Sequence, residues 1–490
     1  MKKNLKFLPA MLAFLTFAAC SKDDSEVVKP EPAAAGIESF GFYQEDNPKL
    51  LFADYMTETI TGTSIDIVLP EQVEVDNLVA RLTTTDGDLV TVLGLTQVSG
   101  ETTNDFSTPL EYLVTEEDTN IIYTVSVSKM ANAVWSRLPM FDTDSITSFS
   151  LGVNPEKYRA NIAYISDRES RDDEKLNLID FDGQSWNYVG DKDFSSARAR
   201  SLDIAFGNSG EPYISFEDDA TEDTYASVMS FENDSWGYVG GGAFSPFESG
   251  MTTISVGANN EVFGFYYIDQ RDHAERRGVA ARIFNGSWAD LPITGRTGMT
   301  RVLRSKEVNG DIYLGIMDYG EGQAVSVYKY SNGTWTTLAD KMKENPENTI
   351  YYYGFSMDVD SEGNVFVAYA ENNGAGTDYQ LLVKKYSVDD DSWSAVGSTA
   401  FTSSDSSNLR TFSVAVDVYG NPILLYTNEL HQPTVVHFDD EINNWGTTMV
   451  LESVDADDLM IEVSPDGVAY AAYLVDNNLY VHKYDSPDNN

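Results

Sequence analysis

Cysteine, histidine and basic residues are scarce in this 490-residue chain. Its only cysteine is Cys20, so no disulfide can form within one molecule. The four histidines, His273, His431, His437 and His482, show none of the spacings typical of a metal site. Lys and Arg number 32 against 78 Asp and Glu, which gives a formal charge of −46. A protein with so large a negative charge repels the phosphates of nucleic acid, and nucleic acid is excluded as a partner.

Catalytic signatures are also scarce. The chain contains neither a Gly-x-Ser-x-Gly nucleophile turn nor a glycine-rich phosphate loop. Glycoside hydrolysis requires a pair of carboxylates, and 78 acidic residues offer too many candidates to choose among. The sequence therefore assigns no catalytic residue. A polysaccharide-degrading enzyme, hydrolase or lyase, stays open as the alternative to a binding protein.

The amino terminus carries a short apolar run that ends at Cys20. Three lysines precede residues 7–19, which are too few to span a bilayer as a mature helix. Residues 15–20 (LTFAAC) resemble a lipoprotein box, which implies that residues 1–19 are a signal peptide and that Cys20 carries acyl chains. A plain cleaved signal with a spare cysteine is the alternative. No later segment is apolar for long enough to cross a membrane, so the lipid would be the only anchor.

A charged linker follows the cysteine, over residues 20–35. Its start, residues 21–26 (SKDDSE), resembles the export signal of Bacteroidota lipoproteins that reach the outer face of the outer membrane. An ordinary charged tether is the alternative. The resemblance implies a lipid-anchored outer-membrane protein that faces the cell exterior. Loss of the three signal lysines would change the formal charge from −46 to −49.

Residues 36–131 have the pattern of a small β-sandwich. Short stretches alternate between apolar and polar residues, as in residues 64–68 (SIDIV) and 122–127 (IYTVSV), and turn residues such as Asp86-Gly87 separate them. With the Tyr-x-Val-x-Val pattern at residues 123–127, this segment resembles the bacterial immunoglobulin-like modules of Bacteroidota surface lipoproteins. Such a module implies a spacer between the anchor and the rest of the chain.

Residues 133–490 repeat a unit of about fifty residues. Seven tryptophans mark it, spaced by 47 to 58 residues: Trp135, Trp186, Trp236, Trp288, Trp335, Trp393 and Trp445. An aromatic residue that ends an apolar run, such as Phe181 or Phe231, stands shortly before each one after the first. An earlier hairpin in each unit brings the count to four antiparallel strands, which is one β-propeller blade.

The two ends of the repeat array complement each other. Trp135 lacks a preceding aromatic strand, whereas the strand at residues 479–484 (LYVHKY) lacks a following tryptophan. The sequence therefore predicts a closed seven-bladed propeller whose last blade takes its outer strand from residues near Trp135. The fold class is all-β: a sandwich followed by this propeller. We expect the tryptophans to pack their own outer strands against neighbouring blades, with a ring of ligand-stacking sites as the alternative.

Arginines gather in the predicted loops despite the acidic composition. The loops between second and third strands and the connections between blades share one face, which is the expected working surface. The candidate ligand-binding residues there are Arg168, Arg171, Arg198, Arg200, Arg271, Arg276, Arg301 and Arg410. Arginine pairs well with carboxylates and sulfates, so an anionic glycan or an acidic protein would fit. Pairing with nearby acids such as Asp167, Glu169 and Asp272 is the alternative.

Seven acidic residues recur at the ends of the second strands: Asp167, Asp218, Asp269, Asp318, Glu371, Glu429 and Asp476. Their equivalence predicts a shared structural task, such as accepting backbone N–H groups at the turn. Calcium binding is the alternative, although no Asp-x-Asp-x-Asp-Gly loop is present. No cofactor is expected otherwise. The sequence thus predicts a monomeric, non-enzymatic surface lipoprotein whose propeller binds a glycan or a protein, and which meets the membrane only through its lipid.

Overall fold

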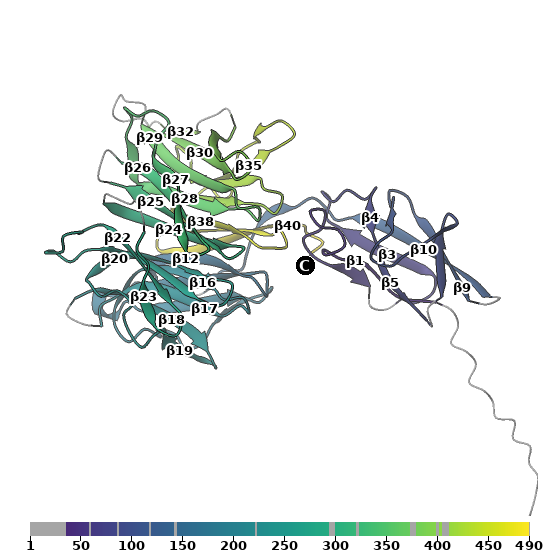
Figure 1. Ribbon diagram of the computed structural model, residues 1–490, viewed down its shortest axis with the longest axis horizontal. Coiled ribbons are helices and arrows are strands. Elements are labelled where there is room, and N and C mark those ends of the chain that lie inside the picture. The colour runs from purple at the N-terminus through teal and green to yellow at the C-terminus, as the bar shows by residue number, and fades with distance from the viewer. Residues whose placement is uncertain are drawn as a thin grey trace, which may run out of the picture.

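The protein is an all-β molecule of two parts (Figure 1), and the predicted fold class is confirmed. The computed structural model describes residues 36–57, 60–85, 88–116, 119–141, 145–220, 223–293, 299–319, 323–372, 379–397, 401–403 and 411–489. Cys20 and the predicted signal peptide lie outside these ranges, as do Arg410 and the side chain of Arg301. Among the described residues, helical structure is limited to short turns such as η2 (Arg171–Asp173).

The amino-terminal part is a sandwich of two main sheets. One has the order β2 (Tyr55–Thr57), β1 (Ile37–Phe42), β5 (Arg81–Thr84). The other has the order β3 (Ser64–Leu69), β10 (Thr119–Lys129), β9 (Leu110–Glu116), β6 (Leu89–Val92), β7 (Leu95–Thr96), and a small ribbon joins β4 (Leu78–Val79) to β8 (Thr103–Asn104). Phe40, Phe42 and Tyr112 pack edge to face between the sheets, where alternate residues of each strand point inward.

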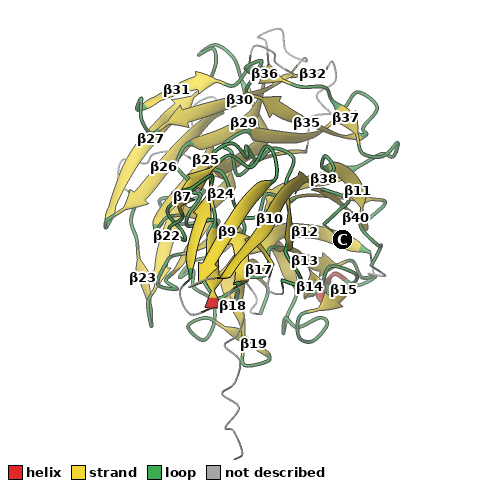
Figure 2. Cartoon of the chain, turned by 90° about the vertical axis from the view of Figure 1, so that its right-hand side faces the viewer, coloured by secondary structure: helices red, strands yellow, loops and turns green. Residues whose placement is uncertain are grey.

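The carboxy-terminal part is a ring of four-stranded sheets. In blades 1 to 6 the strands run outward from the central axis in sequence order, so the first strand is innermost and the fourth lies at the rim, as β19, β23, β27 and β31 do in Figure 2. Blade 1 consists of β12 (Ile146–Asn154), β13 (Arg159–Ser166), β14 (Leu176–Phe181) and β15 (Trp186–Tyr188); blade 2 of β16 (Ala199–Phe206), β17 (Pro212–Asp218), β18 (Tyr225–Glu232) and β19 (Ser235–Tyr238). Blade 3 consists of β20 (Ser249–Val256), β21 (Val262–Ile268), β22 (Val279–Phe284) and β23 (Trp288–Asp290); blade 4 of β24 (Thr300–Val308), β25 (Asp311–Asp318), β26 (Ala324–Ser331) and β27 (Thr334–Met342).

The next two blades have interrupted outer edges. Blade 5 consists of β28 (Ile350–Val359), β29 (Val365–Asn372), β30 (Tyr379–Ser387) and β31 (Ser392–Ala395), with β32 (Phe401–Ser403) also paired to β30. Blade 6 consists of β33 (Phe412–Val416), β34 (Pro422–Thr427), β35 (Pro433–Asp439) and β36 (Asn444–Trp445), with β37 (Met449–Val450) also paired to β35. In both blades the outer edge therefore consists of two short strands that pair with the same third strand.

Blade 7 joins the two ends of the repeat array. It contains β38 (Asp457–Val463), β39 (Ala469–Val475) and β40 (Asn478–Asp485), and its outer strand is β11 (Val134–Arg137). Trp135 lies opposite Tyr484, and Arg137 lies opposite His482, in an antiparallel pair. Seven apolar clusters fill the ring, one between each pair of neighbouring blades, including blades 7 and 1. The predicted partnership of the two orphan strands is therefore present in the structure.

Six of the seven tryptophans donate an indole N–H hydrogen bond to the preceding blade or to the chain that follows its outer strand. Five indole N–H groups donate to a backbone carbonyl just after the preceding blade's outer strand or at the equivalent place: Trp186 to Pro139, Trp236 to Val189, Trp288 to Val239, Trp393 to Leu338 and Trp445 to Val396, at 2.8 to 3.1 Å. Trp135 donates to His437 of blade 6 at 3.3 Å. The interpretation of these residues as packing residues is confirmed, and the ring of stacking sites is not what they form.

Close packing between blades predicts a sharp cost for one added methyl group. A Cβ at Gly315, in β25, would lie 2.5 Å from Phe355 Cζ and 2.8 Å from Met357 Sδ on the next blade. We expect Gly315→Ala to lower the free energy of unfolding by about 1–3 kcal/mol through overpacking, measurable by thermal or urea unfolding. Gly237→Ala is the matched control, because a Cβ there would meet nothing within 4 Å. Equal stability of the two variants would contradict this packing.

The sandwich contacts the propeller on the face that carries the hairpins between first and second strands. Lys49 forms an ion pair with Glu362 of blade 5 at 2.8 Å, and the rings of Phe52 and Tyr419 of blade 6 lie 5.0 Å apart. The backbone N–H of Ala131 donates to Asp488 at 2.7 Å. The opposite face, where the first strands begin, bears none of these contacts.

Candidate functional site

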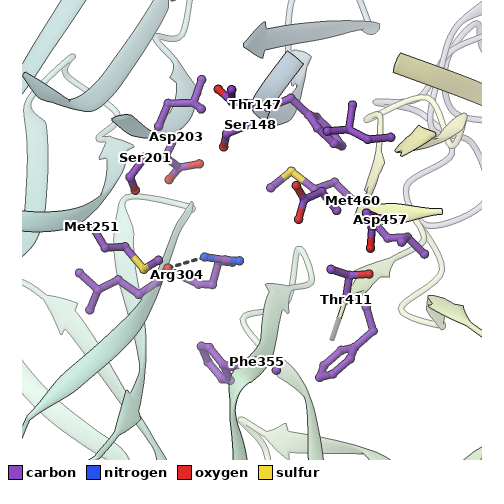
Figure 3. A pocket seen from close by; sticks show the side chains of 18 of the residues that line it. Thr147, Ser148, Ser201, Asp203, Met251, Arg304, Phe355, Thr411, Asp457 and Met460 are labelled. Atoms are coloured by element: carbon purple, nitrogen blue, oxygen red, sulfur yellow. Dashed lines mark hydrogen bonds between the residues drawn. The ribbon is translucent and has the colours of Figure 1, made fainter. Parts of the chain in front are cut away.

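A large cavity opens at the propeller face opposite the sandwich contacts. It has a volume of about 1170 Å³ and is lined by the beginnings of the innermost strands of all seven blades (Figure 3). Leu474, Asp476 and Asn477, at the end of a second strand, complete its wall. We call this cavity the funnel. It lies on the face formed by the blade connections and the loops between second and third strands, which is the face that the sequence favoured.

Bulges shape the wall of the funnel. The pairing of first and second strands shifts at the start of β12, β16, β20, β24, β28 and β38. Ser201, Met251 and Asp458 lie at these shifts with positive φ angles of 39°, 30° and 50°, and all three line the funnel. Such a conformation costs a non-glycine residue about 1–3 kcal/mol. Bulges redirect side chains, so here they direct polar and apolar groups into the cavity.

The funnel wall combines carboxylates, hydroxyl groups and apolar side chains. Its five aspartates are Asp203, Asp455, Asp457, Asp458 and Asp476, and Arg304 is the one cation among the lining residues. Hydroxyl groups come from Thr147, Ser148, Ser201, Thr252 and Thr411, and apolar surface from residues such as Phe149, Met251, Phe355, Phe412 and Met460. Burial raises the pKa of Asp203, and burial together with Asp457 raises that of Asp458. The arrangement offers many hydrogen-bond acceptors and disfavours a ligand with many negative charges.

Asp203 and Arg304 lie where the funnel meets a second cavity, and we call this place the waist. Both residues also line this second cavity, which has a volume of about 390 Å³ and lies further along the channel, with Phe412, Leu459 and Met460. Asp203 accepts hydrogen bonds from Thr253 Oγ1 at 2.6 Å, Ser150 Oγ at 3.1 Å and the Ile254 N–H at 3.2 Å. These bonds tie blades 1, 2 and 3 together at the waist.

An ion triad crosses the channel beyond the waist. Lys306 of blade 4 contacts Asp358 of blade 5 at 3.0 Å and Glu462 of blade 7 at 2.9 Å. Burial lowers the pKa of Lys306, but the two carboxylates raise it by more, so the pKa lies above the ordinary value. Burial raises the pKa of Glu462, and Lys306 counteracts this shift. A ligand that enters the funnel therefore meets Arg304 first and this fixed triad behind it.

The acidic residues at the ends of the second strands do not all share one task. Asp218 accepts the Ala220 N–H at 3.0 Å, and Glu371 accepts the N–H groups of Glu344 and Asn345 at 2.8 and 3.0 Å, as expected. Asp476 instead lines the funnel and is exposed. Among the described residues, no three His, Cys, Asp or Glu side chains are grouped to hold a metal ion. Calcium stays a prediction that this geometry does not support.

Four of the candidate arginines form ion pairs within or between loops. The pairs are Arg168 with Asp193 at 2.8 Å, Arg198 with Glu174 at 2.7 Å, Arg200 with Asp219 at 2.7 Å and Arg276 with Asp269 at 3.3 Å. Arg171 and Arg271 are exposed, and neither they nor the paired four line the funnel. All four partners differ from the nearby acids that the sequence suggested. A ligand-binding role for these arginines remains a prediction.

Sequence reasoning missed the residues at the waist. Asp203 and Arg304 lie in β16 and β24, which read as ordinary strands, and neither residue belongs to a motif. One feature of the sequence could have indicated them. Each charged residue lies in the innermost strand of its repeat, where alternate side chains face the central axis. The pairs Ser201 and Asp203, and Arg304 and Lys306, have this spacing.

In the part of the chain that the structure describes, no helix has the length and apolarity required to span a bilayer.

Comparisons with known proteins bear on the sandwich more directly than on the propeller. Three solved structures similar to the chain are a fungal copper-containing alcohol oxidase (11% identity over 73% of this chain and 77% of that one, TM-score 0.45), the Aleuria aurantia lectin (10%, 59% and 92%, 0.41) and the Penicillium chrysogenum α-L-arabinanase (11%, 73% and 98%, 0.40). No curated protein sequence matches the chain. Residues 52–127, within the sandwich, match the family model described as SGBP, N-terminal, which links this part of the chain to surface glycan-binding proteins of Bacteroidota.

Proposed function

We propose that the protein is a surface glycan-binding protein whose propeller funnel holds the carbohydrate. The observation that carries this proposal is the funnel itself, a cavity of about 1170 Å³ in a chain whose sandwich matches a glycan-binding family model. Pockets for small ligands have volumes of about 300–1,000 Å³. The funnel therefore has room for several sugar rings.

The chemistry of the wall suits a polyhydroxylated ligand. Carboxylates such as Asp455, Asp457 and Asp476 accept hydrogen bonds from sugar hydroxyl groups, and charge-assisted bonds of this kind are the stronger ones. The ring of Tyr351 and the thioethers of Met251 and Met460 supply the apolar surface on which a sugar ring can lie. Five aspartates and one arginine line the cavity. This excess of negative charge opposes binding of a densely anionic polymer.

Anchoring and orientation extend the proposal. An acyl group on Cys20 would hold the sandwich close to the membrane, and the sandwich contacts the propeller face opposite the funnel mouth. A monomer on the outer membrane would then present the funnel to the cell exterior. A protein ligand at the same face is the alternative partner.

An array of neutral and charged oligosaccharides, probed with residues 21–490, tests the proposal. We expect saturable binding to at least one glycan class, confirmed by calorimetric titration, without release of reducing ends during prolonged incubation. Absence of binding across the array would contradict the proposed function. Continuous release of reducing ends, lost on replacing a funnel aspartate by asparagine, would instead favour the polysaccharide-degrading enzyme, because the funnel carries carboxylates with raised pKa.

A further inference from the structure

Arg304 occupies the floor of the funnel without a charged partner. Its side chain points into the funnel (Figure 3). It is half-buried and also lines the deeper cavity. One guanidinium N–H, on Nη1, donates to the Leu303 carbonyl at 2.8 Å. Within the described ranges of the chain, Arg304 forms no ion pair. Guanidinium carries five N–H donors in a planar fork, so most of its donors face the cavity.

Other enclosed cations of the propeller differ from Arg304 in this respect. Lys306, two residues further along β24, contacts both Asp358 and Glu462. Arg198 contacts Glu174, and Arg282 contacts Asp290 at 2.9 Å. A buried charge that lacks a counter-ion is costly, so proteins normally supply one. Arg304 is the exception in a wall that is otherwise rich in carboxylates.

Asp203, across the waist, is already engaged elsewhere. Its carboxylate accepts bonds from Thr253, Ser150 and Ile254 and does not contact Arg304 directly. Burial lowers the pKa of Arg304, and the more distant charge of Asp203 only partly opposes this shift. Arginine does not lose its proton in proteins, so the guanidinium stays a cation. The floor of the funnel therefore has room and hydrogen-bond donors for one anionic group of a ligand.

We propose that Arg304 binds the carboxylate of a single acidic sugar at the end of a glycan that enters the funnel. This proposal rests on the proposed function and specifies its ligand class. Neutral sugar residues would occupy the upper funnel, where four aspartates, Asp455, Asp457, Asp458 and Asp476, accept hydrogen bonds from hydroxyl groups and would repel further carboxylates. The protein should bind an oligosaccharide with one terminal uronate more tightly than a neutral oligosaccharide. It should also bind it more tightly than an oligosaccharide in which every sugar is a uronate.

Matched oligosaccharides on several backbones test this preference. Tetrasaccharides with xylan, glucan and galactan backbones are prepared in neutral form, with one terminal glucuronate and in its carboxyl-reduced form, and oligogalacturonate serves as the densely charged probe. We expect residues 21–490 to bind at least one terminally charged probe about tenfold more tightly than its carboxyl-reduced form, because bonds to charged groups are worth more than neutral ones. Oligogalacturonate should bind more weakly than that probe.

Three variants locate the effect at Arg304. Arg304→Gln should remove the preference for the charged probe, whereas Arg304→Lys should keep most of that preference. Arg159→Gln, which removes an exposed arginine on the opposite face, should behave as wild type. Thermal unfolding checks that each variant is folded. Equal affinities for charged and reduced probes, or an unchanged preference in Arg304→Gln, would overturn the proposal.

The two proposals can fail separately. Wild-type protein that binds neutral glycans without preferring a terminal uronate would overturn the role of Arg304 and leave the glycan-binding function intact. Wild-type protein that binds no glycan on the array would overturn both. Preference for oligogalacturonate over the singly charged probe would also overturn the inference, because it would require the upper wall to accept further negative charge.

Discussion

A chain that begins at residue 145 is expected to lose at least about 3–5 kcal/mol of unfolding free energy relative to a chain that begins at residue 131. The shorter chain lacks β11, whose Trp135 packs 5.2 Å from Tyr484 and whose backbone pairs with β40. The deleted segment holds the partly buried Trp135 and the buried Leu138, and loss of such side chains from a core costs about 3–5 kcal/mol. It also exposes the edge of β40. Urea unfolding followed by tryptophan fluorescence or circular dichroism measures the difference.

The chain that begins at residue 131 is the matched control, because both shortened chains lack the sandwich. Trp135→Ala in the full chain removes the aromatic contact without truncation and should show part of the same loss. We also expect blade 7 of the shorter chain to unfold separately and less cooperatively. Without β11, only its apolar contacts with blade 6 and with blade 1 would stabilise it. Identical unfolding curves for the two shortened chains would contradict closure of the ring by β11.

Acidification should destabilise the closure through His482. This side chain is 5% exposed on β40, opposite Arg137, and burial together with the Arg137 charge lowers its pKa from 6.5 to about 4. The folded state therefore binds the proton less well than the unfolded state does. Stability is lost as pH falls from about 6.5 and the loss is complete below about 4. A shift of this size corresponds to about 3 kcal/mol.

The effect of His482 is measured as a difference between two proteins. Other buried groups act in the opposite direction: burial raises the pKa of Asp417 to about 6, which stabilises the folded state as pH falls. Unfolding free energies of wild type and His482→Asn are therefore compared at pH 7.5 and pH 4. Wild type should lose about 3 kcal/mol more than the variant over this range. Parallel pH profiles would show that the pKa of His482 does not differ between the folded and unfolded states, contrary to the prediction.

The sequence carried enough information to predict the ring. Tryptophans recur at nearly constant spacing because each blade needs the same contact with its predecessor, and a repeated constraint leaves a repeated residue. The unmatched strand at residues 479–484 and the unmatched Trp135 then specified the closure. The second strands repeat in the same way, and several carry a fully buried tyrosine, such as Tyr164, Tyr369 and Tyr473.

The candidate site could not be predicted in the same way. The bulges at Ser201, Met251 and Asp458 arise where inner strands converge on the axis, and no common residue type marks them. Ion-pair partners such as Asp193 for Arg168 come from other loops, so sequence neighbours were a poor guide. The sequence pattern pointed to loops, whereas Arg304 lies in a strand and the cavity is lined mainly by strand residues.

Affinity of one array-selected glycan for Ser148→Trp, compared with wild type, tests the central claim most directly. Ser148 lines the funnel and is half-buried, so an indole there would occupy space that the sugar needs (Figure 3). Ser394→Trp, on the exposed rim strand β31, is the control for an added tryptophan. If the funnel holds the glycan, Ser148→Trp weakens binding at least about tenfold while Ser394→Trp binds as wild type does. Wild-type affinity in a folded Ser148→Trp protein would place the glycan elsewhere and contradict the account.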